Sequence, residues 1–100
     1  MKVELIISEN FLSYFTAEIA EQAVKIVERK YNTKIDLSIL RDEDVKYPVI
    51  KVPEFPPIVV KALPSVSELV NMISLALDIS RLLPPASLGV NDIGRADTMV

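Results

Sequence analysis

The sequence predicts an α/β domain in which a four-stranded mixed sheet carries two helices, mainly on one face. Apolar residues alternate with polar ones in short segments and recur every three to four residues in two longer segments, and the resulting order is β-α-β-β-β-α. With 100 residues, half of them apolar, the chain can build one core and has no room for a second. The expected domain spans residues 1–83, and residues 84–100 are expected to form an extended or partly disordered tail.

The first strand is predicted at Val3 to Ser8, a short apolar run with Lys2 and Glu4 interleaved, which is the pattern of a strand buried at least on one face. Residues 9–15 are expected to form a polar and aromatic loop. A helix follows from about Thr16 to Tyr31, because apolar residues recur there at spacings of three and four. Ser13 or Thr16 can cap its start, and Asn32 can end it, since asparagine tolerates the left-handed conformation found just past many helices.

Three more strands are expected in the middle of the chain. The segment "TKIDLSIL" alternates strictly, with Ile35, Leu37 and Ile39 on one face. Two shorter strands, at 49–52 and 58–63, are separated by a proline-rich bend at 53–57. Polar residues at alternate strand positions predict that the face without helices is solvated, and these residues are Lys2, Glu4, Lys34, Asp36, Ser38, Lys51 and Lys61.

The last helix is predicted from Val66 to about Leu83, and Pro84 stops it. Its start carries a capping box, in which the Ser65 hydroxyl and the Glu68 carboxylate each accept a hydrogen bond from a backbone N–H. The apolar arc covers roughly 220°, whereas a surface helix needs only about 100° to face its own core.

The excess apolar surface of that helix needs a cover. We expect a homodimer with an interface at Met72, Leu75, Ile79 and Leu83. The alternative cover is the tail, with Leu88, Val90 or Ile93 folded back onto the helix.

Composition excludes several classes of chemistry. The chain contains no Cys and no His, which removes disulfides, thiolate and imidazole catalysis and the common zinc and iron ligand sets. The run "RDED", Arg41 to Asp44, has no ligand spacing and is expected to be a solvated turn, so neither a metal site nor a cofactor is predicted.

Charge and hydropathy bear on partners and location. A net charge of −3 with scattered basic residues argues against a nucleic-acid binder. No signal peptide and no membrane span is expected, so a cytoplasmic location is the default. Seven Pro residues, with many Ile, Val, Glu and Lys, suit a thermophilic source.

Several segments together resemble the thioredoxin and glutaredoxin superfamily over residues 2–80. "VELIISENFLSYFTAEIAEQAVKIVERK" looks like the family's first strand, active-site loop and first helix, and "VVKALPSVSELVNMISLAL" looks like its fourth strand and last helix. "KYPVIKV" looks like the segment where the family places a cis-proline, which points to Tyr47-Pro48; an ordinary trans bond is the alternative. The resemblance implies that the third strand pairs with the first. It also implies that "RDEDVKY" replaces a helix of a three-layer arrangement.

The chain departs from the family in its chemistry. Members that exchange disulfides use Cys-x-x-Cys at the start of the first helix, whereas this chain places Phe11 and Tyr14 about where the two sulfurs would be. It therefore looks like a cysteine-less, non-redox member. We expect a non-catalytic binding or assembly domain, and we assign no catalytic residue.

The aromatic residues of the loop allow two interpretations. In the first, Phe11, Tyr14 and Phe15 plug the top of the core. In the second, a groove accepts an extended peptide or a protein partner, and its candidate residues are Phe11, Ser13, Tyr14, Tyr47 and Pro48.

Two alternatives from other classes stay open. One is a cysteine-independent enzyme that uses the loop at Glu9 to Tyr14, although nothing in the chain supplies a matched acid or base partner. The other is a ferredoxin-like domain that regulates through a small molecule. Its second and third strands would form a hairpin across "RDED".

Overall fold

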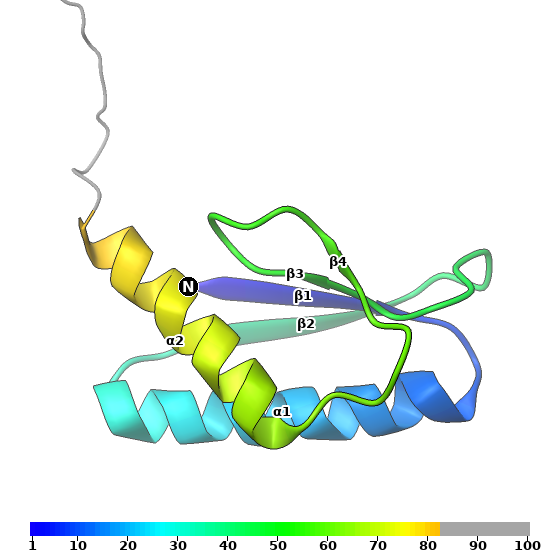
Figure 1. Cartoon of the computed structure of the whole chain (residues 1–100), viewed down its shortest axis with the longest axis horizontal. Helices are drawn as coiled ribbons and strands as arrows, with labels where there is room; N and C mark the ends of the chain where they lie inside the picture. Colours follow the sequence, from blue (N-terminus) through cyan, green and yellow to red (C-terminus); the bar gives the residue numbers. More distant parts are fainter. Residues whose placement is uncertain (83–100) are drawn as a thin grey trace, which may run out of the picture.

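The computed structural model describes residues 1–82, which form one sheet and two helices (Figure 1). The elements are β1 (Lys2–Ile7), α1 (Phe11–Tyr31), β2 (Asp36–Arg41), β3 (Val49–Lys51), β4 (Ile58–Val59) and α2 (Val66–Leu82). This order confirms the predicted β-α-β-β-β-α arrangement. The expected tail and Leu83, the last residue of the expected domain, lie outside the described residues.

The four strands form one mixed sheet in the order β2-β1-β3-β4. β1 is parallel to β2 and antiparallel to β3, and β3 is antiparallel to β4. Since β2 and β3 lie on opposite sides of β1, the hairpin expected for the ferredoxin-like alternative is wrong. β1 is therefore the strand on which both halves of the sheet depend.

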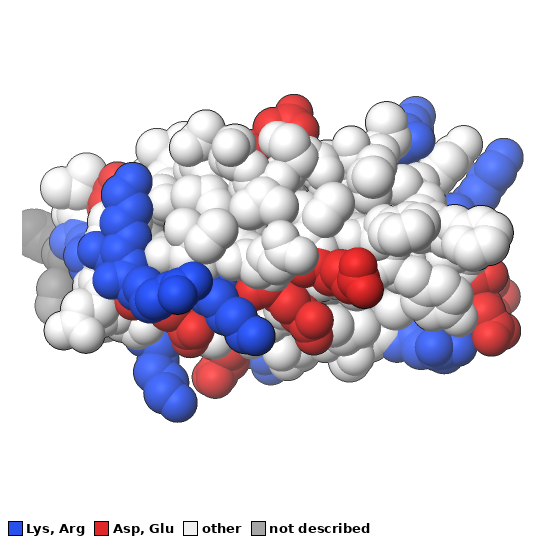
Figure 2. All heavy atoms as spheres, turned by 90° about the horizontal axis from the view of Figure 1, so that it is seen from below, with Lys and Arg blue, Asp and Glu red and all other residues white. Residues whose placement is uncertain are grey.

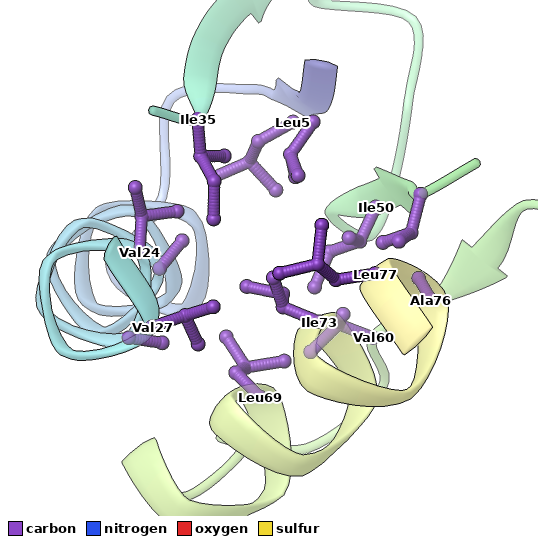
Figure 3. Packing of buried hydrophobic residues seen from close by; sticks show 14 of the residues in the cluster. Leu5, Val24, Val27, Ile35, Ile50, Val60, Leu69, Ile73, Ala76 and Leu77 are labelled. Carbon is purple, nitrogen blue, oxygen red and sulfur yellow. The ribbon is translucent and has the colours of Figure 1, made fainter. Parts of the chain in front are cut away.

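One hydrophobic core lies between the sheet and the two helices. Figure 3 shows Leu5 and Ile50 from the sheet, Val27 from α1 and Ile73 from α2 pointing into a common space. Every second residue of β1 is buried on this side. Full burial of an aliphatic side chain contributes roughly 1.5–3 kcal/mol to the free energy of unfolding, so this cluster is the main support of the fold.

α1 is longer than the sequence predicted. It begins at Phe11 rather than near Thr16, and Asn10 is its N-cap with extended backbone angles (φ −158°, ψ 168°). The other end is as predicted: Asn32 adopts the left-handed conformation (φ 50°, ψ 53°), and its N–H donates to the Glu28 carbonyl. The first turn therefore belongs to the helix, and the predicted loop is reduced to a short link after β1.

The capping box of α2 is confirmed. The Glu68 N–H donates to Ser65 Oγ at 3.0 Å, and the Ser65 N–H donates to Glu68 Oε1 at 2.8 Å. Two of the N–H groups that a helix start leaves without partners are thus satisfied reciprocally. In residues 1–82, neither helix is long and apolar enough to cross a membrane.

A tight bend connects β3 to β4. The Phe55 N–H donates to the Val52 carbonyl at 3.2 Å, and Glu54 has a positive φ of 71°. With Pro53 at the second position, this is the pattern of a type II turn, whose third position favours glycine. The flanking prolines also limit strand length, so β3 and β4 are shorter than the predicted segments 49–52 and 58–63.

Candidate functional site

Polar side chains hold the start of α1. The Asn10 side-chain oxygen accepts a hydrogen bond from the Ser13 N–H at 2.8 Å, and the Asn10 amide donates to Ser8 Oγ at 2.9 Å. The Ser8 N–H donates in turn to Ser13 Oγ at 3.2 Å. These bonds tie the end of β1 to the first turn of α1 and satisfy one of its otherwise unpaired N–H groups.

The serine and threonine side chains of this region lie inside the protein. Ser13, a residue of the predicted groove, is fully buried, and so is Thr16 one turn further along α1. The Thr16 hydroxyl has no hydrogen-bond partner. Because neither side chain reaches the surface, the contribution of Ser13 at this site is to hold the start of the helix.

The aromatic side chains of the same turn point the other way. Phe11 is 82% exposed, and Tyr14 and Phe15 are exposed as well. Residues four apart lie on the same side of a helix, so Phe11 and Phe15 form an outward-facing pair. The interpretation that these aromatics plug the top of the core is therefore wrong.

The remaining groove candidates lie on the chain leading into β3. Pro48 is fully buried, and its carbonyl accepts a hydrogen bond from the Val60 N–H at 2.8 Å. Tyr47 is half-buried, with the Lys46 Nζ 5.6 Å from its ring centroid. The five candidates thus divide between buried and accessible positions and do not form one shared exposed surface.

Two connections meet at this end of the sheet. The Asp42 N–H donates to the Ile7 carbonyl at 2.9 Å, and the Glu9 N–H donates to Glu43 Oε1 at 3.3 Å. The Asp44 N–H donates to Asp42 Oδ1 at 2.9 Å. The Asp42 and Glu43 carboxylates of "RDED" thus accept bonds from backbone N–H groups. Among residues 1–82, no group of three His, Cys, Asp or Glu side chains could hold a metal ion.

The sheet face away from the helices carries a row of apolar side chains. The register places Ile6 beside Leu40 on one side and Val49 on the other, and it places Val49 beside Val59. The next row is polar and consists of Ser38, Glu4 and Lys51. The expectation of a solvated polar face therefore holds for the row that contains Glu4 and is wrong for the row that contains Ile6.

The predicted dimer interface on α2 is only partly exposed. Leu75 is 51% exposed, whereas Met72 and Ile79 are half-buried within the chain, and Leu83 lies outside the described residues. Met72 lines a hollow with β4 and the segment that follows it. The homodimer stays a prediction, and the apolar surface that α2 offers for it is narrower than the periodicity suggested.

Charged side chains are unevenly spread over the surface. Figure 2 shows Lys and Arg gathered at the end of the molecule where α1 ends, while uncharged side chains cover much of the middle of the same face. A hollow at that basic end is lined by Lys25, Glu28, Arg29, Asn32, Thr33 and Lys34. Since a carboxylate lies among its basic groups, this hollow is not a simple anion site.

Comparison with known proteins adds nothing to this geometry. No protein-family model matches the sequence, and the search of curated proteins finds no match.

Proposed function

We propose that this chain is a non-catalytic binding module with thioredoxin-like architecture, and that it engages a protein partner through the aromatic side chains at the start of α1. The observation that carries the proposal is the exposure of Phe11, with Tyr14 and Phe15 beside it on the same turn. Large exposed aromatic side chains are enriched at binding surfaces, where they supply contact area at low entropic cost.

The sheet order supports the architectural part of the proposal. β3 pairs with β1 rather than with β2, which is the pairing that the thioredoxin-like resemblance implies. Both helices pack on one face, as expected when "RDEDVKY" replaces the helix of the other face. The short link between β1 and α1 holds its position through the Asn10 cap.

The non-catalytic part of the proposal is supported by the burial of the serine hydroxyl at the start of α1. Ser13 supplies the one hydroxyl between Glu9 and Tyr14 that resembles a nucleophile, and it is fully buried. The chain has no thiol and no imidazole to act with it. The surface at this end therefore offers apolar contact and no activated group.

Site-specific photo-crosslinking in the native host tests this function. A photoreactive phenylalanine analogue at Phe11 is expected to capture a defined protein partner. The same analogue at Arg29, which is exposed at the far end of α1, should not capture it. Phe15→Ala should reduce capture from position 11 without changing the circular dichroism spectrum, because Phe15 is exposed. Equal capture from both positions, or none from position 11, would overturn the proposal.

A further inference from the structure

The outer edge of β2 presents backbone groups without partners in the described chain. β2 is the last strand on its side of the sheet. The Asp36 N–H donates to the Met1 carbonyl, and the Asp42 N–H donates to the Ile7 carbonyl, so even-numbered residues of β2 direct their backbone groups toward β1. Because these directions alternate along a strand, the N–H and C=O groups of Leu37, Ile39 and Arg41 point away from the sheet.

The side chains of the same residues leave apolar surface exposed at this edge, which favours association with another chain. Leu37, Ile39 and Arg41 pair with buried residues of β1 and therefore lie on the helix face, yet Leu37 is half-buried and Ile39 is 40% exposed. Leu37 and Ile39 border a hollow of about 270 Å³ between β2 and α1, whose other lining residues are Glu21, Val24, Lys25 and Glu28. An edge strand of six residues that has three apolar side chains and no proline is a template for pairing with another strand.

We propose that the partner of this edge is β2 of a second copy of the chain. The two β2 strands run antiparallel about a two-fold axis that is perpendicular to the sheet and passes between the two Ile39 residues. The sheets of both copies then join into one continuous sheet of twice the width, with all helices on the same face. This assembly does not depend on the binding role of the α1 start.

The register follows from the backbone. A two-fold axis of this kind pairs residues on the same face and therefore passes between two copies of one residue. The two middle residues of β2, Ser38 and Ile39, give the registers with the most paired residues. With Ile39 at the centre, Leu37 faces Arg41 of the second copy, and every outward N–H and C=O group of these residues gains a partner. With Ser38 at the centre, Arg41 would face Ile35, whose N–H already donates to Glu28 Oε2 at 2.9 Å.

Charge complementarity favours a second copy as the occupant. In the Ile39-centred register, Arg41 lies opposite Leu37 of the other copy, on the helix face where Glu21 and Glu28 line the hollow. Within residues 1–82 of the single copy, Arg41 makes one ion pair, an exposed one with Glu43 at 3.7 Å. Lys25 is the one basic residue lining the hollow, so each copy presents an acidic groove to an incoming guanidinium.

Proline substitution at matched positions tests the interface. Ile39→Pro removes an outward N–H that the single copy does not use in its sheet. Val59→Pro does the same on β4, where Val59 is 51% exposed and points outward because the Val60 N–H bonds to Pro48. Sedimentation equilibrium should give a dimer for wild type and for Val59→Pro, and at least about 30-fold weaker association for Ile39→Pro, as expected when two inter-strand bonds are lost.

Further variants distinguish an interface at β2 from an interface on α2. Arg41→Glu should weaken the dimer, and adding Glu21→Arg should restore part of the loss. Leu75→Glu, on the exposed side of α2, should leave the dimer unchanged. The proposal is overturned by a wild type that stays monomeric up to millimolar concentration, or by a dimer that survives Ile39→Pro in a chain with wild-type circular dichroism. It is also overturned by a dimer that Leu75→Glu dissociates and Ile39→Pro does not.

Discussion

The two edge strands of the sheet, β4 and β2, differ in how many backbone N–H and C=O groups they leave unpaired. β4 is two residues long, with Pro57 directly before it. Within this strand only Val59 points its N–H and C=O groups outward, because Ile58 and Val60 face β3. β2 is six residues long and has no proline. One edge of the same sheet is thus protected against pairing and the other is not.

The difference shows that edge protection is a local property of the sequence. Proline beside a short strand removes a donor and fixes the backbone, which prevents a neighbouring strand from docking. The β2 segment instead carries apolar residues on both of its faces, Leu37 and Ile39 on the helix face and Leu40 on the other, and it contains no proline that would block a neighbouring strand. β2 therefore has the sequence of a strand that can take neighbours on both sides, although residues 1–82 of the single copy supply only β1.

The largest expected effect on stability comes from a substitution in β1, the strand that connects the two halves of the sheet. Leu5 lies in β1 and is fully buried in the core. Leu5→Ala should lower the free energy of unfolding by about 2–5 kcal/mol, since it deletes buried methyl groups and leaves a cavity. Urea unfolding followed by circular dichroism measures the change. A loss below about 1 kcal/mol would mean that the core does not connect the two halves of the sheet as described.

A smaller effect on stability distinguishes the residues of β2 whose backbone groups point toward β1 from those whose backbone groups point outward. Leu40 directs its N–H toward β1, whereas Ile39 directs it outward, and both side chains are exposed to a similar extent. Leu40→Pro should therefore destabilise the single chain by about 1–3 kcal/mol more than Ile39→Pro, because it also leaves a carbonyl of β1 unpaired. Thermal unfolding at low protein concentration gives the comparison. Equal losses would contradict the assignment of outward and inward groups.

The smallest expected effect is a gain in stability from a substitution in the bend before β4. Glu54 holds a positive φ of 71° in the bend before β4, a conformation that costs a non-glycine residue about 1 kcal/mol. Glu54→Gly should stabilise the protein by up to about 1 kcal/mol, reduced by the greater freedom of glycine in the unfolded chain. Glu54→Ala is the matched control, and it should give no gain. A loss of stability in Glu54→Gly would show that the Glu54 side chain contributes contacts.

Local patterns predicted the element order and several helix ends. The capping box at Ser65 and Glu68 and the left-handed Asn32 are set by neighbouring residues alone, so a single sequence contains the information. The start of α1 was missed because Phe11, Tyr14 and Phe15 are exposed. Exposed aromatics on the first turn interrupt the apolar periodicity by which a helix is recognised.

Features that depend on register could not be predicted. Ile6, Leu40, Val49 and Val59 each stand beside other apolar residues in the sequence, and only the pairing of four strands shows that these four share one row. The outward direction of the β2 backbone groups likewise depends on which residues bond to β1. In the same way, burial of Ser13 follows from the true start of α1 and not from its residue type.

The central position of β1 has a consequence for the order of events during synthesis. It is the earliest of the described strands to leave the ribosome, yet both strands that flank it, β2 and β3, are made later. Until residues 36–51 have emerged, the apolar side chains of Val3, Leu5 and Ile7 have no sheet to join. The nascent chain thus carries β1 without its neighbouring strands while the residues from β1 to β3 are made, an interval in which its exposed apolar side chains favour aggregation.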